Sequence, residues 1–225
     1  MMTRPDLIVF DVNETLSDMG PLSEAFAAEG VPGHLARTWF SGILRDGFAV
    51  AAAGGNAAFA EIAQDSLTRL LSEHDVSAPG DSVERIMGTV TSLGVHPDVV
   101  PGVEALHQVA ELVTLSNGAA QVAETLLESA GIRGHFAELL SVEDAPAWKP
   151  APSAYDHAAE RCGREPGRML LVAVHPWDIH GAHQAGLRTA WINRAGAEYP
   201  GYFSRPDLHA ADLPALADQL TSLHD

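Results

Sequence analysis

An unbroken run of four apolar residues near the start of the chain, Leu7-Ile8-Val9-Phe10, ends directly at a carboxylate, Asp11. A strand that faces water on one side alternates apolar and polar residues, whereas this run predicts a strand that is covered on both faces. Strands of that kind belong to parallel sheets, which carry helices on both sides. The run therefore predicts an α/β fold in which a polar group stands at a strand end.

Three further apolar runs follow later in the chain, and helix-like segments separate them. The runs lie at 112–115, 169–174 and 189–192, and the helix-like segments lie at 103–110, 119–130, 153–162 and 177–185. Alternation of strands with helices, joined by short links that contain glycine, is typical of a doubly wound parallel sheet. We therefore predict a Rossmann-like α/β domain.

An all-helical insertion interrupts this alternation directly after the first predicted strand. Its helix-like segments lie at 22–28, 34–44, 56–71 and 82–93. An insertion at this point lies above the carboxyl edge of the sheet, where ligands bind in open α/β folds. We therefore expect residues 1–16 and 97–225 to form the α/β core, and residues 17–96 to form a helical cap that acts as a lid.

The charge of the chain limits the partners that it can bind. Thirteen Lys and Arg against thirty Asp and Glu give a formal net charge of −17. A chain this acidic repels phosphate backbones and anionic lipids, which disfavours nucleic-acid and membrane-surface roles. It has one cysteine, no apolar stretch long enough to span a bilayer, and no signal-peptide pattern at residues 1–5. We expect a cytoplasmic protein that binds a small molecule, with a locally positive pocket if that molecule is an anion.

Four short polar stretches follow predicted strands, and each contributes one reactive side chain. These side chains are Asp11, Ser116, Lys149 and Asp178. The strand ends of a doubly wound sheet converge on one crevice, so we expect the four groups to meet there. One carboxylate would attack a substrate and the ammonium would stabilise negative charge. The second carboxylate would orient the lysine, activate water or hold a metal.

Together these stretches resemble the four motifs of the haloacid dehalogenase (HAD) superfamily, whose hydrolases use an aspartate nucleophile. The matching segments are Phe10-Asp11-Val12-x-x-Thr15-Leu16, Leu115-Ser116-Asn117-Gly118, Trp148-Lys149-Pro150 and Trp177-Asp178-x-x-Gly181-Ala182. They stand in the order of the family across nearly the whole chain. The helical insertion stands where that superfamily carries its cap, so the resemblance implies a HAD core with an inserted cap domain.

Within the superfamily, the chain is most similar to the 2-haloacid dehalogenases. The shared features are Ser-Asn-Gly at 116–118, Tyr155 six residues after Lys149, and Trp-Asp at 177–178. The resemblance implies that Asp11 displaces halide from the α-carbon of a small 2-haloacid, and that water hydrolyses the resulting ester to a 2-hydroxy acid. Lys149, held by Asp178, would keep Asp11 ionised. The resemblance also implies that no cofactor is needed and that the enzyme is a homodimer formed through the cap.

Eight side chains are predicted to bind the substrate or to position the nucleophile. They are Thr15, Arg37, Trp39, Phe40, Ser116, Asn117, Tyr155 and His175. Phe40 departs from the dehalogenase pattern, which has arginine after the cap tryptophan, and Arg37 lies one helical turn earlier on a similar face as its substitute. Glu14 stands in place of a glycine, and His175 in place of the asparagine of a Ser-Ser-Asn sequence. For His175, a general base, an anion contact and a satisfied polar group all stay open.

A magnesium-dependent phosphatase of the same superfamily is the alternative function. Those enzymes generally carry a general-acid aspartate two residues after the nucleophile, and this chain has Asn13 there. Magnesium would have to bind Asp11, Asn13 and Asp178, which include only two carboxylates. We therefore expect no metal in a dehalogenase and Mg²⁺ only in a phosphatase. The joint presence of Asp11, Lys149 and Asp178 argues against a third alternative, an inactive binding protein.

Overall fold

The computed structural model describes residues 3–77 and 79–223 of the 225-residue chain. The predicted core also includes residues 1–2 and 224–225, which lie outside the described residues. No helix in the described part of the chain combines the length and the apolar character that crossing a membrane requires.

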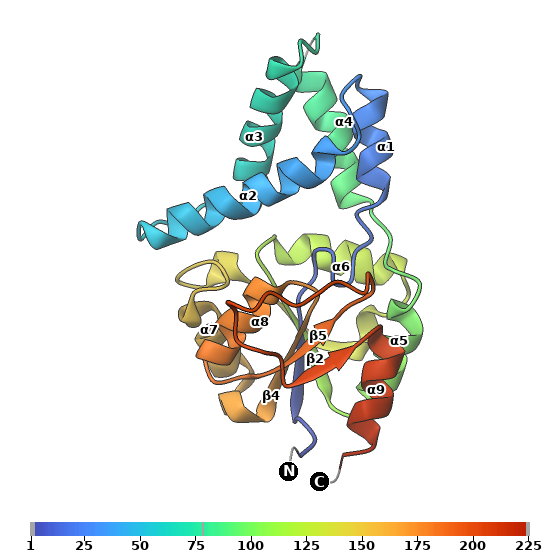
Figure 1. Ribbon diagram of the computed structural model, residues 1–225, viewed down its shortest axis with the longest axis vertical. Helices are drawn as coiled ribbons and strands as arrows, with labels where there is room; N and C mark the ends of the chain where they lie inside the picture. The colour runs from blue at the N-terminus through green and yellow to red at the C-terminus, as the bar shows by residue number, and fades with distance from the viewer. Residues whose placement is uncertain (1–2, 78, 224–225) are drawn as a thin grey trace.

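A six-stranded sheet forms the base of the molecule (Figure 1). Its strands are β1 (Leu7–Phe10), β2 (Glu111–Ser116), β3 (Phe136–Ser141), β4 (Met169–Ala173), β5 (Arg188–Ile192) and β6 (Leu208–Ala210). The spatial order is β3-β2-β1-β4-β5-β6, and every neighbouring pair is parallel. The predicted α/β fold is confirmed, and the four predicted strands coincide with β1, β2, β4 and β5 to within one residue at either end.

Strand β1 lies between two hydrophobic cores, as its unbroken apolar run predicts. Leu7 and Val9 pack into the core on one face of the sheet, and Ile8 and Phe10 pack into the core on the other. All four side chains are completely buried. Helices α5 (Val99–His107), α6 (Ala120–Ser129) and α9 (Leu213–Thr221) supply the second core, whereas α7 (Pro152–Cys162) and α8 (Pro176–Gln184) supply the first.

Strands β3 and β6 and helix α9 were not predicted from the sequence. Both strands lie at the edges of the sheet and pair with a single neighbour. An edge strand needs less apolar cover than a central one, and β3 carries Glu138 in its middle while β6 has only three residues. Neither strand therefore shows the continuous apolar run that marks the central strands.

Four helices between β1 and α5 stand together above the carboxyl edge of the sheet (Figure 1). They are α1 (Pro21–Ala28), α2 (Leu35–Ala52), α3 (Phe59–Glu73) and α4 (Pro79–Thr91). The prediction that the second helix ends at Leu44 was wrong, because the alanine-rich residues that follow favour helix and continue α2 by two further turns. The chain enters and leaves this helical region at a bridge between Ser17 and Val95, where we propose the boundary of the cap.

Helix α2 contacts the core through a glycine that packs on a tryptophan ring. A Cβ atom on Gly47 would lie 2.3 Å from a ring carbon of Trp148. The indole is buried, its Nε1 donates a hydrogen bond to the carbonyl of Ala57 at 2.9 Å, and the ring stacks on Phe59. The residue directly before Lys149 is thus held by both the helix and the α2–α3 link of the cap.

Gly47→Ala is expected to lower the free energy of unfolding by about 1–3 kcal/mol, because the added methyl group overlaps a ring that has no room to move. Gly42→Ala on the same helix is the matched control. Its Cβ would meet no atom within 4 Å. Because alanine lowers the conformational entropy of the unfolded chain, the substitution should stabilise the protein by about 0.4–1 kcal/mol. Urea unfolding of both variants measures the difference, and equal stability of the two would contradict this packing.

Candidate active site

The carboxyl edge of the sheet brings Asp11, Lys149 and Asp178 into direct contact. Asp11 follows β1, Lys149 lies between β3 and α7, and Asp178 lies in the first turn of α8. The Lys149 ammonium nitrogen is 2.9 Å from Oδ1 of Asp11 and 2.6 Å from Oδ2 of Asp178. Lys149 and Asp178 are completely buried and Asp11 is nearly so. The convergence of these three groups follows the prediction from the strand ends.

Burial and the Lys149 ammonium act in opposite directions on the pKa of both carboxylates. Burial favours the neutral amine of Lys149, but the two carboxylates outweigh it and raise the pKa of the lysine. Burial also opposes ionisation of Asp11, yet the charges of Lys149 and His175 hold the pKa of Asp11 well below its usual range. For Asp178 burial is the larger effect and raises its pKa. Asp11 is therefore a carboxylate at neutral pH.

Thr15 and Asn117 hold the reactive groups in place. The Thr15 hydroxyl donates a hydrogen bond to Oδ2 of Asp11 at 2.7 Å. The Asn117 side chain accepts a hydrogen bond from the Lys149 amide at 2.9 Å and donates one to the Lys149 carbonyl at 3.2 Å. Ser116 is buried beside them, and its hydroxyl accepts a hydrogen bond from the amide of Gly118 at 2.9 Å. Asn117 thus positions the lysine backbone, rather than facing a ligand.

Tyr155, which is predicted to bind the substrate, is hydrogen-bonded inside the protein. Its side chain is completely buried, and its hydroxyl donates a hydrogen bond to Oδ1 of Asp178 at 2.6 Å. The hydroxyl is therefore occupied by a residue of the protein. We assign Tyr155 to positioning Asp178, and through it Lys149.

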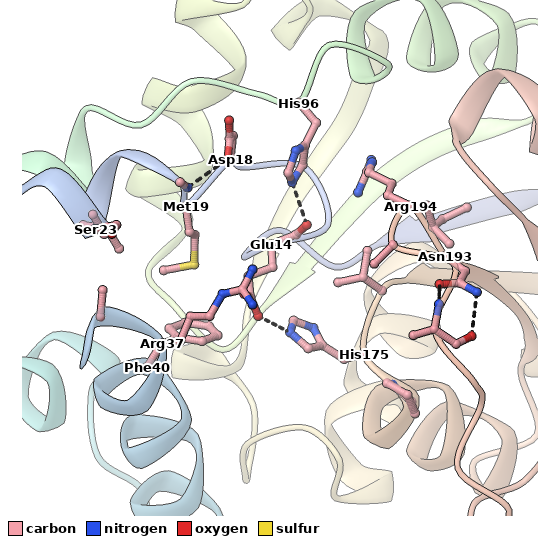
Figure 2. A pocket seen from close by; sticks show the side chains of 18 of the residues that line it. Glu14, Asp18, Met19, Ser23, Arg37, Phe40, His96, His175, Asn193 and Arg194 are labelled. Carbon is pink, nitrogen blue, oxygen red and sulfur yellow. Dashed lines mark hydrogen bonds and ion pairs between the residues drawn. The ribbon is translucent and has the colours of Figure 1, made fainter. Parts of the chain in front are cut away.

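A cavity of about 780 Å³ lies between the cap and the carboxyl edge of the sheet (Figure 2). Arg37 and Phe40 of α2 line it from the cap side, and Glu14 and His175 line it from the core side. Figure 2 shows the Arg37 side chain extending into this space from α2. These two residues of α2 lie where substrate binding was predicted.

Trp39, which is predicted to bind the substrate, does not line this cavity. The indole nitrogen donates hydrogen bonds to the Ala63 carbonyl and the Ser66 hydroxyl, both at 3.1 Å. The ring also packs against Phe26. Adjacent residues on a helix point about 100° apart, so Phe40 faces the cavity while Trp39 packs in the cap.

His175 connects the Asp11 carboxylate to a second carboxylate, that of Glu14. Its Nδ1 is 3.0 Å from Oδ2 of Asp11, and its Nε2 is 2.9 Å from Oε2 of Glu14. Burial disfavours the imidazolium, but hydrogen bonds to both carboxylates raise the pKa of His175 to about 9. At neutral pH the ring is thus a cation that donates a hydrogen bond to each carboxylate. Trp177 stacks on the ring at 5.0 Å.

Glu14 is the residue of this site that the sequence reasoning missed. It was noticed only as a departure from glycine, and its backbone keeps the left-handed conformation, φ 60°, that glycine adopts readily. The available signal was that Glu14 and His175 both depart from the dehalogenase pattern. One of these two residues is acidic and the other is basic, so their joint replacement of the usual residues indicates a contact between their side chains. The structure contains that contact.

The arrangement does not fit a magnesium site. The predicted ligand set for magnesium was Asp11, Asn13 and Asp178, but the Lys149 ammonium already lies between the two carboxylates. In the described ranges, 3–77 and 79–223, no group of three or more His, Cys, Asp or Glu side chains is arranged to hold a metal ion. A fixed ammonium here supplies the positive charge that a divalent ion would otherwise contribute.

Comparisons with known proteins agree with this geometry. Residues 5–186 match the family model of the haloacid dehalogenase-like hydrolases. Haloacetate dehalogenase H-2 of Moraxella sp. (strain B) is 28% identical over 218 residues, which cover 96% of this chain and 97% of that protein. (S)-2-haloacid dehalogenase 2 of Pseudomonas sp. (strain CBS-3) is 25% identical over 218 residues, which cover 95% and 94%.

A solved structure of an L-2-haloacid dehalogenase has the same fold. It superposes with a TM-score of 0.89 at 26% identity, and the match covers 98% of this chain and 100% of the other. The family match spans most of the chain and includes the ends of β1, β2 and β4, where the reactive side chains stand. This chain belongs to the haloacid dehalogenase-like hydrolase family.

Proposed function

We propose that this enzyme is a hydrolytic 2-haloacid dehalogenase, which converts a small 2-haloacid and water to a 2-hydroxy acid, halide and one proton. The observation that carries the proposal is the buried ion-pair set in which Lys149 bridges Asp11 and Asp178. This set supplies an ionised carboxylate nucleophile and a fixed positive charge without a metal. The haloacid and haloacetate dehalogenases to which the chain is similar support the substrate class.

In the first step the Asp11 carboxylate attacks the α-carbon of the haloacid, and halide leaves with the electrons of its bond to carbon. The low pKa of Asp11 keeps its carboxylate charged, so no base is needed to generate the nucleophile. A halide leaving group also needs no proton. The product of this step is an ester between Asp11 and the substrate.

In the second step water adds to the Cγ carbon of the Asp11 ester and releases the 2-hydroxy acid. Negative charge develops on the carboxyl oxygens of Asp11 as water adds. The Lys149 ammonium, 2.9 Å from Oδ1, is already in place to stabilise that charge. Asp178 and Tyr155 hold the lysine in this position.

The cavity matches a small anion with an apolar α-substituent. The Arg37 guanidinium lies at its wall and is the group that we assign to the substrate carboxylate, in the role predicted from the sequence. The buried ring of Phe40 offers an apolar surface beside it. The cytoplasmic location and the homodimer stay predictions.

The proposed function is tested by measuring halide release from chloroacetate, bromoacetate and 2-chloropropionate, with and without an excess of chelator. We expect release from at least one of them and no loss of rate with chelator, because Lys149 supplies the positive charge. The alternative is tested in parallel with a phosphate ester and added Mg²⁺. Phosphate release that requires magnesium, with no halide release from any haloacid, would establish the phosphatase instead.

Tyr155→Phe separates positioning from substrate binding. The variant loses a hydrogen bond to a buried carboxylate, so kcat is expected to fall about 10–150-fold while KM stays near its wild-type value. Tyr202→Phe is the control, because that side chain is exposed at the surface. Steady-state kinetics of halide release measure both variants. A large rise in KM for Tyr155→Phe with unchanged kcat would restore the role in substrate binding.

A further inference from the structure

The cavity between the cap and the carboxyl edge of the sheet is larger than the smallest haloacids require. Its volume of about 780 Å³ lies within the range of roughly 300–1,000 Å³ that is typical of sites for drug-sized ligands. Chloroacetate, by comparison, is a single methylene group between a halogen and a carboxylate. Most of the cavity therefore lies beyond the atoms that react, and the two-step reaction leaves this space without a role.

One side of this space, which we call the β5 wall, comes from the end of β5 and the link that follows it. Its apolar residues are Trp191, Ile192, Ala195, Ala197 and Pro200. Met19, Leu22 and Ala36 border the same cavity from the segment that enters the cap and from α1 and α2. Apolar side chains on both sides favour a ligand with an apolar body, because binding removes the surface of both from water.

The polar side chains of the β5 wall are already held inside the protein. Oδ1 of Asn193 accepts a hydrogen bond from the Ala197 amide, and its Nδ2 donates one to the Ala197 carbonyl, both at 2.9 Å. Nε and Nη2 of Arg194 donate hydrogen bonds to the Asp98 carboxylate, also at 2.9 Å. The third nitrogen of Arg194, Nη1, has no partner among the described residues, but it is shielded from solvent and therefore from a ligand in the cavity. Neither side chain thus offers the ligand a free polar group at this wall.

Arg37 supplies a positive charge that is open to a ligand. Its side chain extends into the cavity, and among the described residues its guanidinium has no hydrogen bond or ion pair (Figure 2). The carboxylates of Asp18 and Glu198 line the cavity as well, and both would repel a second negative charge on the ligand. The cavity therefore matches a ligand that has one carboxylate and an uncharged, apolar remainder.

We propose that the enzyme prefers 2-haloacids whose α-substituent is apolar and larger than a methyl group, and that the β5 wall determines this preference by enclosing the substituent. The proposal rests on the proposed function and narrows its substrate class. With the substrate carboxylate at Arg37 and the α-carbon at Asp11, the remaining cavity is available to the α-substituent. Haloacetates have no such substituent and leave that space to water.

The size of the preference follows from the apolar surface that the substituent buries. Each methylene group that moves from water into an apolar site favours binding about fourfold. The substituent stays bonded to the α-carbon through both steps, so its contacts with the wall are the same in the ground state and in the transition state. Such uniform binding lowers KM and raises kcat/KM, while kcat changes little.

The test is the release of bromide from 2-bromopropionate, 2-bromobutyrate and 2-bromohexanoate, with each enantiomer measured separately. All three react at a carbon that carries one alkyl group, so their intrinsic reactivity is similar. For the enantiomer that reacts, kcat/KM is expected to rise about fourfold per methylene, or roughly 60-fold from 2-bromopropionate to 2-bromohexanoate. A value that stays constant or falls with chain length would overturn the proposal and assign the cavity to water.

Ala197→Trp tests the β5 wall itself. The indole would occupy space in the cavity, while the contacts of residue 197 with Asn193 use backbone atoms and should persist. The kcat/KM for 2-bromohexanoate is expected to fall at least about tenfold, and the loss for 2-bromopropionate should be much smaller. Ala211→Trp is the matched control, because Ala211 is exposed and does not border the cavity, and it should change neither value. Equal losses for both substrates in Ala197→Trp, or no loss for either, would overturn the assignment to this wall.

Calorimetric binding of propionate, butyrate and hexanoate separates this proposal from the function on which it rests, because these acids have no halogen. Hexanoate should bind most tightly, with a negative change in heat capacity. No halide release from any haloacid, combined with this order of affinity, would overturn the dehalogenase and still support the cavity as a site for an apolar acid. Halide release combined with equal affinities and a flat chain-length profile would overturn the proposal alone. If Ala197→Trp does not fold, the wild-type affinities and chain-length profile decide.

Discussion

Asp11→Asn is expected to lower kcat for halide release by at least about 10⁴-fold, because an amide is a far weaker nucleophile than a carboxylate. Lys149 and Asp178, the other members of the buried ion-pair set, are not free to take over its role. Lys149 is a buried ammonium and Asp178 is held by both Lys149 and Tyr155. The amide of the variant still accepts a hydrogen bond from Thr15, so the fold should persist. Halide release under saturating haloacid measures the loss.

Asp18→Asn is the matched control, since Asp18 is another carboxylate at the wall of the cavity. Its Oδ1 accepts a hydrogen bond from the amide of Gly20, which asparagine can also accept, so activity should stay near that of the wild type. Incorporation of heavy oxygen from labelled water into wild-type Asp11 during a single turnover provides a direct check. Label that enters the first hydroxy acid formed, and not Asp11, would show that water attacks the substrate itself.

Lys149→Met is expected to have the largest effect on stability, lowering the free energy of unfolding by about 3–5 kcal/mol. The substitution leaves two buried carboxylates, Asp11 and Asp178, with no cation between them. Burial and mutual repulsion then raise the pKa of both, and protonation relieves the repulsion. The destabilisation should therefore shrink as the pH falls. Activity should also drop about 10²–10³-fold, because the charge that stabilises the reacting carboxyl group is gone.

A double variant, Lys149→Met with Asp178→Asn, tests the cause of that destabilisation. Removing one of the two charges should restore part of the lost stability, so the effects of the single variants will not add. Urea unfolding at neutral and acidic pH measures all the variants. If Lys149→Met unfolds at the wild-type denaturant concentration, or if the double variant is less stable than both single variants, unpaired buried charge is not the cause.

Those parts of the fold could be predicted in which burial of a strand on both faces requires an uninterrupted run of apolar residues. The residues of β1 are apolar without interruption because alternate side chains enter different cores, and that pattern predicted a parallel sheet. The ends of such strands meet at one edge, which predicted the meeting of Asp11 with Lys149 and Asp178. The edge strand β3 carries Glu138 and needs no such continuous pattern, so its place in the sheet had to come from the structure.

The roles of individual side chains were harder to predict than their presence in the site. Spacing places Tyr155 and Asn117 near the reactive lysine, but it does not say whether their polar atoms face the cavity or another residue. Both are held by partners inside the protein, Tyr155 by Asp178 and Asn117 by the Lys149 backbone. The contact of Glu14 with His175 spans 161 residues of sequence, so no local spacing rule reaches it.

The contact of Trp148 with the cap limits how freely this cap can be exchanged. The ring needs a glycine at position 47 and a backbone carbonyl at Ala57, and its residue directly precedes Lys149. A cap transplanted from a relative would have to supply both features. Without them the Trp148 ring would be displaced, and the position of the neighbouring residue Lys149 would change with it. The cap and the segment Trp148-Lys149-Pro150 are therefore structurally coupled, and new substrate ranges are more readily built by changing cavity residues such as Arg37 and Phe40 than by replacing the cap whole.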